Sequence, residues 1–216
     1  MDARRKVTCF VTRGSGTIAE LCVFWHAGSG IQVPAGTVED GETFEDGARR
    51  EVFEETALSG LKLAGHLGST VHDLRGAGWG VVRRNVELRV GPGMDAAKTR
   101  WKLDPGGYVD VVERAAGFAR VVWAERDLDS ANGIVYARLE GWVSDDDLHA
   151  EQERRFYHFR APVDSPDTWR TLENQRYEFT LYWVPLTPKP TLLVAVSQAW
   201  LDQFYGALVA GVPSPA

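Results

Sequence analysis

Three glutamates within five consecutive residues, Glu51, Glu54 and Glu55, are the side chains of this sequence whose spacing most clearly indicates chemistry. On a helix, which turns by roughly 100° per residue, they would fall within an arc of about 100°. Carboxylates crowded in this way repel one another unless a cation neutralises them. Oxygen-rich sites of this kind suit hard divalent ions, Mg²⁺ first and Mn²⁺ second. Such ions bind diphosphate oxygens and acidify a bound water, so the pattern predicts a metal site that serves phosphate chemistry.

The residues just before the glutamates contain signals for the start of a helix and for a loop held against it. Thr43 is a candidate N-cap, and Asp46 would complete an arrangement like a capping box. Glu42 and Arg50 carry opposite charges on either side of this start. Gly36 lies where the loop turns back toward the helix, and a glycine allows a backbone to approach a metal closely.

The segment from Gly36 to Leu58 resembles the Nudix box, the signature of a family of hydrolases. Eight of the nine fixed positions match, and the exception is Ala57, where the family usually has glycine. The resemblance implies an α/β fold, a Nudix-type α/β/α sandwich with a mixed sheet. A strand-like hairpin, residues 7–13 and 20–26, precedes the box, as in Nudix proteins.

The resemblance also implies an activity and roles for individual residues. Nudix enzymes are Mg²⁺-dependent hydrolases that cleave the diphosphate linkage of a nucleoside diphosphate joined to another moiety, as in a nucleotide, a dinucleotide or a nucleotide sugar. Carried over to this chain, Glu51, Glu54 and Glu55 are metal ligands and catalytic groups, and the Gly36 carbonyl is a further ligand. The Glu42 and Arg50 pair would brace the loop against the helix.

Two questions about the chemistry stay open at this level. The general base is either Glu51 or Glu54 itself or a glutamate outside the box, for which the candidates are Glu140, Glu151 and Glu153. The alternative function is a catalytically weak Nudix-fold module that binds a nucleotide or regulates a partner. Ala57 and an unusually long segment after the box motivate that alternative.

Composition limits the remaining classes of function. The chain has 216 residues and a formal net charge of −6, which argues against nucleic acid as a partner. Cys9 and Cys22 are isolated, and we expect buried free thiols. Because no signal-peptide core or apolar span is present, we expect a cytoplasmic protein that does not associate with membranes.

The organisation of the chain indicates one Nudix domain over residues 1–216 that is enlarged by a strand-rich insertion at about residues 73–133. Strands at residues 61–68, 154–160 and 179–186 and a helix at residues 196–208 are expected to complete the domain. Residues 83–89 resemble residues 154–160, and residues 118–123 resemble residues 179–183. The insertion therefore looks like a partial duplication of the C-terminal half. Besides the hydrolase and the binding module, a third interpretation is that the inserted segment serves to form a homodimer.

Substrate-binding residues cannot be assigned from the sequence. For each candidate, a structural role in the core or on a solvated strand is favoured over substrate binding. The tryptophans near predicted strand ends that could stack on a base are Trp25, Trp79, Trp101, Trp142 and Trp169. The arginines that could hold phosphates are Arg49, Arg83, Arg84, Arg154 and Arg155.

Overall fold

A computed structural model describes residues 3–26, 29–126, 135–173 and 177–211 of the chain. The chain divides into two compact units, which are described separately. The box unit comprises Arg5–Thr70 and Arg154–Ala216, and the strand unit comprises Met1–Arg4 and Val71–Glu153. No helix of the described ranges has the length and apolar character needed to cross a membrane.

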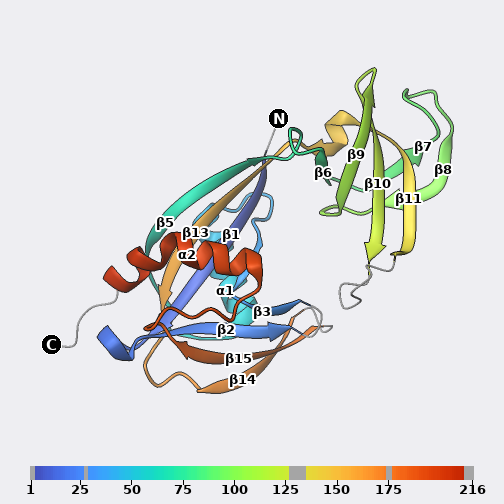
Figure 1. Cartoon of the computed structure of the whole chain (residues 1–216). Coiled ribbons are helices and arrows are strands. Elements are labelled where there is room, and N and C mark those ends of the chain that lie inside the picture. The colour runs from blue at the N-terminus through green and yellow to red at the C-terminus, as the bar shows by residue number, and fades with distance from the viewer. Residues whose placement is uncertain (1–2, 27–28, 127–134, 174–176, 212–216) are drawn as a thin grey trace. The chain divides into compact units, whose positions relative to one another are not determined.

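One sheet and two helices form the box unit (Figure 1). Among the described residues, the strands follow the order β14-β15-β2-β1-β13-β5, with β3 paired to β2 and β4 paired to β1. The elements are β1 (Arg4–Arg13), β2 (Glu20–His26), β3 (Gly30–Gln32), β4 (Ala35–Thr37), α1 (Phe44–Thr56), β5 (Lys62–Asp73), β13 (Glu151–Arg160), β14 (Thr168–Glu173), β15 (Tyr177–Pro185) and α2 (Ala195–Ala210).

The sheet of the box unit is mixed. Strand β2 pairs antiparallel with β1, and β15 pairs antiparallel with β2. At one end of β13, the Arg154 guanidinium donates to the Val7 carbonyl oxygen (3.1 Å). At the other end, the Ala161 amide donates to the Thr12 carbonyl oxygen (2.8 Å). Since residue numbers rise in the same direction along both strands, β13 runs parallel to β1.

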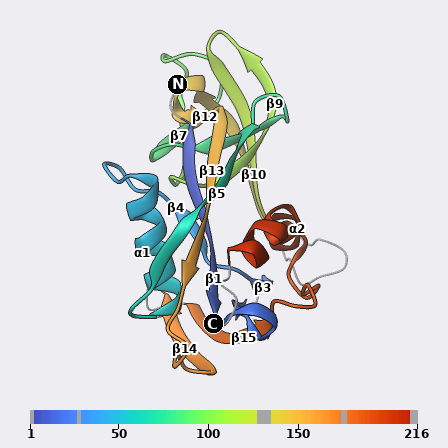
Figure 2. The ribbon, with the colours of Figure 1, turned by 90° about the vertical axis from the view of Figure 1, so that its left-hand side faces the viewer.

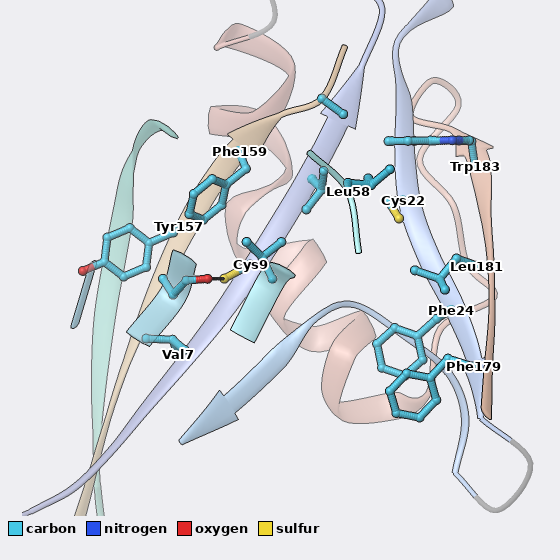
Figure 3. Packing of buried hydrophobic residues seen from close by; sticks show 14 of the residues in the cluster. Val7, Cys9, Cys22, Phe24, Leu58, Tyr157, Phe159, Phe179, Leu181 and Trp183 are labelled. Atoms are coloured by element: carbon cyan, nitrogen blue, oxygen red, sulfur yellow. Dashed lines mark hydrogen bonds between the residues drawn. The ribbon is translucent and has the colours of Figure 1, made fainter. Parts of the chain in front are cut away.

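Alternation along the strands gives the sheet two apolar faces, each covered by one helix (Figure 2). Val7, Cys9 and Val11 of β1 pack with Ala48 and Val52 of α1 in one buried cluster. Figure 3 shows part of this cluster, in which the rings of Phe24 and Phe179 stack with their centroids 4.6 Å apart.

The opposite face of the sheet packs under α2. Phe10 and Phe156 lie there with Leu201, Phe204 and Leu208 of the helix. The predicted α/β/α sandwich with a mixed sheet is confirmed. Cys9 and Cys22 are buried free thiols, as expected from their isolation in the sequence.

Helix α1 starts as its sequence predicts. Thr43 is the N-cap, and its hydroxyl oxygen accepts a hydrogen bond from the Asp46 amide (3.1 Å). Glu45 and Asp46 place negative charge in the first turn, where the helix dipole favours it. The helix ends at Ala57, which adopts a left-handed conformation with φ 53°. A left-handed non-glycine residue costs on the order of 1 kcal/mol, and the bond from the Ala57 amide to the Phe53 carbonyl (2.7 Å) is kept nonetheless.

The strand unit contains a second sheet with its own core. Among the described residues, its strands follow the order β12-β6-β9-β10-β11-β7-β8. They are β6 (Trp79–Val82), β7 (Val86–Arg89), β8 (Lys98–Leu103), β9 (Tyr108–Ala115), β10 (Phe118–Arg126), β11 (Val135–Ser144) and β12 (Leu148–His149). Val82, Leu88, Val109, Val121 and Val143 belong to the buried cluster, whose members all come from this unit.

The expected insertion of residues 73–133 lies within the strand unit, which continues to Glu153. Residues 127–134 of that segment lie outside the described part of the chain. In the first pair of segments compared for a duplication, residues 154–160 lie wholly in β13, whereas only Val86–Arg89 of residues 83–89 form a strand. The duplication stays a prediction.

Deleting most of the strand unit tests whether the box unit folds without it. The amides of Leu74 and Arg75 both donate to the Ala150 carbonyl oxygen (2.9 and 3.1 Å), so the chain leaves and returns at adjacent points. Replacing residues 75–149 with a short glycine-rich turn is expected to leave a box unit that unfolds cooperatively, because each unit has its own core. Circular dichroism during thermal unfolding measures this.

A shortened chain without a cooperative transition would show that the box unit depends on the strand unit for folding. Light scattering on the full-length and shortened proteins tests the dimerisation interpretation in the same experiment. A monomeric full-length chain would exclude it.

A buried histidine predicts how stability depends on pH. His158 is 2 % exposed, and its Nε2 is 2.8 Å from the Thr12 hydroxyl oxygen. Burial, assisted by the charge of Arg160, lowers the pKa of His158 to about 4. In the unfolded chain the His158 ring takes up a proton near pH 6.5, whereas in the folded protein it does so only near pH 4. The folded protein is therefore not destabilised by this group above pH 6.5, and its free energy of unfolding falls as the pH decreases from 6.5 toward 4.

We expect unfolding at pH 5 to be easier than at pH 7.5 by about 2 kcal/mol from this group. Urea titrations at both pH values measure the difference, and His158→Gln is the comparison because it removes the titrating ring. An equal pH dependence in the two proteins would contradict the assignment to His158.

Candidate active site

The loop that carries Gly36 is attached to the sheet by a short antiparallel ladder. Strand β4 pairs with β1 so that Lys6 is opposite Thr37, Val7 is opposite Gly36 and Thr8 is opposite Ala35. This register brings the backbone of β4 alongside α1.

Arg50 donates to five acceptor atoms on four residues, and those on Thr37 and Glu42 tie the loop to the helix. Its Nε and Nη2 donate to the two carboxylate oxygens of Glu42 (2.8 and 3.0 Å), and Nη2 also donates to the Thr37 carbonyl oxygen (2.8 Å). Its Nη1 donates to Glu51 (3.1 Å) and to Glu54 (3.0 Å). The Arg50 hydrogen bonds lower the pKa of Glu42. The pairing that the family resemblance implied is present in a bidentate geometry.

Glu51 is in close contact with the Gly36 backbone. A Cβ atom placed on Gly36 would lie 1.8 Å from the Glu51 carboxyl carbon and 1.9–2.0 Å from its oxygens. Only glycine therefore leaves room for this carboxylate in its present position. Glu51 is 7 % exposed, and burial raises its pKa while the nearby Arg50 charge acts in the opposite direction.

Glu55 and Glu54 occupy the same end of the helix in different environments. The buried Glu55 carboxylate accepts a hydrogen bond from the Ala35 amide (2.9 Å). The Thr171 hydroxyl, on β14, donates to the Glu55 carbonyl oxygen (2.8 Å) and holds this turn of the helix against the sheet. The Glu54 side chain is 46 % exposed.

These side chains surround a cavity of about 460 Å³ at the junction of α1, β4 and β1. Its lining includes the predicted Gly36, Arg50, Glu51, Glu54 and Glu55. Glu42 is not part of the lining and acts on the site through Arg50. The remaining lining residues, which the sequence did not indicate, are Lys6, Ala35, Thr37 and Glu39.

The oxygen-rich lining fits a hard divalent cation in its chemistry. As the side chains lie, no three His, Cys, Asp or Glu residues of the described ranges converge closely enough to hold an ion. The physical reason is that Glu51 and Glu54 face Arg50, whereas Glu55 faces the Ala35 amide. Three carboxylates in one cavity, with a glycine backbone against one of them, nevertheless supply the type of donor that Mg²⁺ prefers.

The candidate residues for substrate binding are dispersed over the chain. Trp142 is buried, Trp169 donates to the Thr56 carbonyl oxygen (2.7 Å), and Trp25, Trp79 and Trp101 are exposed. Four of the candidate arginines have structural contacts. Arg49 pairs with Glu45 and Arg84 pairs with Asp147, whereas Arg154 is buried against the Trp200 ring and Arg155 lies over the Phe44 ring. Arg83 is half-buried in the strand unit.

Of the glutamates considered as a base outside the box, Glu140 lies on β11 of the strand unit, and Glu151 and Glu153 lie at the start of β13, where the chain passes from the strand unit to the box unit. Glu140 forms ion pairs with Arg120 and Arg138 (both 3.0 Å).

No curated protein matches the chain. Similar solved structures include a mutT/nudix family protein from Listeria innocua, with 12 % identity, a TM-score of 0.44, and coverage of 97 % of this chain and 96 % of that chain. The family model described as NUDIX domain matches residues 2–87. This range includes the complete box and the strands on either side of it, and the match confirms, over these residues, the resemblance to the Nudix family that the sequence predicted.

Proposed function

We propose that this protein is a Mg²⁺-dependent hydrolase that cleaves the diphosphate linkage of a nucleoside diphosphate joined to another moiety, such as a nucleotide, a dinucleotide or a nucleotide sugar. The NUDIX domain implies the superfamily of hydrolases that act on linked nucleoside diphosphates. The substrate class and the dependence on Mg²⁺ are our proposals.

One observation carries the proposal. Glu51, Glu54 and Glu55 line a single cavity together with Gly36 and Arg50, and the contact between Gly36 and Glu51 leaves no room for a side chain. A merely solvated acidic helix would not need a glycine on a neighbouring strand to accommodate one of its carboxylates.

We assign each box residue a role in that chemistry. Glu51, Glu54 and Glu55 would hold the metal, with the Gly36 carbonyl as a further ligand. When bound, Mg²⁺, or Mn²⁺ in its place, offsets phosphate charge and acidifies a water. Arg50 keeps Glu51 and Glu54 on the loop side of the helix. Glu54 is the most accessible of the three carboxylates, which makes it our choice within the box for the group that accepts a proton from water.

The test is a panel of nucleoside diphosphate derivatives, incubated with the full-length protein with and without Mg²⁺ and analysed for products by chromatography. Cleavage of some members that requires the metal supports the proposal and defines the substrate class. The panel includes nucleoside triphosphates, dinucleotides and nucleotide sugars, because the box chemistry does not distinguish among them.

The alternative, a catalytically weak module that binds a nucleotide or regulates a partner, predicts a different outcome from the same samples. Ligands of the panel would raise the melting temperature without being cleaved. Binding without turnover would indicate that the protein is such a module and not a hydrolase.

A further inference from the structure

Lys6 contributes a positive charge to a cavity that is otherwise mostly acidic. It lies on β1 opposite Thr37, and its Nζ donates to the Thr37 hydroxyl oxygen (2.9 Å). Four glutamates line the cavity, at positions 39, 51, 54 and 55, against two cationic side chains, those of Lys6 and Arg50. A diphosphate that enters the cavity would therefore meet net negative charge.

The two cations differ in how they are engaged. All three nitrogens of the Arg50 guanidinium donate to protein acceptors on Thr37, Glu42 and Glu54. These bonds hold the loop and the helix together. A phosphate could bind Arg50 only by breaking part of that brace. Lys6 carries a compact ammonium with three rotatable donors on a flexible stem, and its bond to the Thr37 hydroxyl is not part of the Arg50 brace.

The surroundings of Lys6 also place its charge near the box carboxylates. Lys6 lies on β1 and Glu51 lies on α1, and both residues line the same cavity. The Lys6 ammonium therefore contributes its charge to the cavity that the Glu51 carboxylate also lines.

We propose that Lys6 is a substrate-binding residue that donates a charge-assisted hydrogen bond to the diphosphate group in this cavity. The inference rests on the proposed function, since it assigns to the same site a specific contact with the substrate. A structural alternative is that Lys6 only joins β1 to β4 through Thr37. The two roles make different predictions for ligand binding and for metal binding.

The first test uses methylenediphosphonate, a diphosphate analogue that cannot be hydrolysed, with full-length protein and Mg²⁺ in a calorimeter. We expect Lys6→Met to weaken binding about 10- to 100-fold, the loss that a charge-assisted hydrogen bond of about 1.5–3 kcal/mol implies. Lys6→Arg should retain most of the affinity because it keeps the charge. The matched control is Lys62→Met, which removes an exposed lysine at the start of β5.

The second test measures Mn²⁺ binding to the same variants by electron paramagnetic resonance, without ligand. Because the Lys6 charge opposes a cation beside Glu51, Lys6→Met should bind Mn²⁺ several-fold more tightly than the wild type. Tighter metal binding combined with weaker diphosphonate binding is the expected signature. A purely structural role predicts that both affinities fall together or that neither changes, and either result would overturn the proposal.

The outcome for Lys6 is separable from the outcome for the proposed function. A wild-type protein that cleaves substrates, with Lys6 variants that bind diphosphonate normally, removes Lys6 from the site and leaves the hydrolase intact. A wild-type protein that neither cleaves the panel nor binds diphosphonate refutes both.

Discussion

Glu55→Gln is expected to lower turnover at least about 100-fold, in the range seen when an electrostatic contact to the reacting group is lost. Glutamine has nearly the same shape as glutamate, and its amide oxygen can still accept the hydrogen bond from the Ala35 amide (2.9 Å in the wild type). The variant therefore loses the charge while the fold is kept. Glu54→Gln is expected to cause a loss of the same size, because its carboxylate lines the same cavity.

Steady-state turnover on the substrate that the panel identifies measures these losses, with melting temperatures as a check on folding. Glu45→Gln is the control, since it neutralises a glutamate on the first turn of the same helix that pairs with Arg49 and is not part of the cavity lining. Unchanged turnover in either variant would remove that glutamate from the catalytic assignment.

Gly36→Ala is the second substitution expected to have a large effect, because the added methyl group would displace a neighbouring carboxylate. The new Cβ would lie 1.8–2.0 Å from the Glu51 carboxyl group, so that group must move. Since the displaced atoms are at the end of a flexible side chain, we expect little change in the unfolding free energy. Turnover should fall about 100-fold or more, because a shift of about 1 Å in a catalytic group can cost that much.

A double-mutant cycle identifies the cause of this loss. If Gly36→Ala acts by displacing Glu51, it should have almost no further effect in a Glu51→Gln background whose activity is already reduced. Gly65→Ala on β5 is the matched control, because a Cβ there meets no atom within 4 Å. If the fold losses of turnover in the two single variants multiply in the double variant, Gly36 acts independently of Glu51.

Local patterns in the sequence were sufficient to predict helix α1 and the carboxylates on it. The N-cap at Thr43 and the spacing of Glu51, Glu54 and Glu55 are properties of one continuous segment, so no tertiary information was needed. The bidentate pair of Arg50 and Glu42 joins residues eight positions apart and was accessible through the family resemblance. The end of the helix was less clear, because Ala57 adopts a conformation that normally indicates glycine.

The rest of the cavity could not be derived from the sequence because it depends on strand register. Lys6 lies beside Gly36 and Glu51 through the pairing of β1 with β4, which joins segments about thirty residues apart. Nothing in the local sequence of either strand fixes that alignment. The first strand was predicted to begin at Val7, whereas β1 begins at Arg4 and includes Lys6.

The extent of the added segment was hidden for a related reason. Alternating apolar residues predict that residues 118–123 and 154–160 form strands, but not which sheet each strand joins. In the structure, residues 118–123 lie in a sheet with its own core, around Val121 and Val143, and β13 belongs to the box unit's sheet. The hydrogen bonds at Leu74 and Ala150 define where the added segment leaves and returns.

The most direct test of the central claim is metal-dependent cleavage by the wild-type protein and Glu55→Gln side by side. Each is incubated with the preferred member of the panel over a series of Mg²⁺ concentrations and with a chelator, and the products are quantified. We expect wild-type cleavage that rises with Mg²⁺, stops with the chelator and is nearly absent in Glu55→Gln. Cleavage that persists with the chelator, or that is equal in the two proteins, would contradict the assignment of this cavity as a metal-dependent hydrolase site.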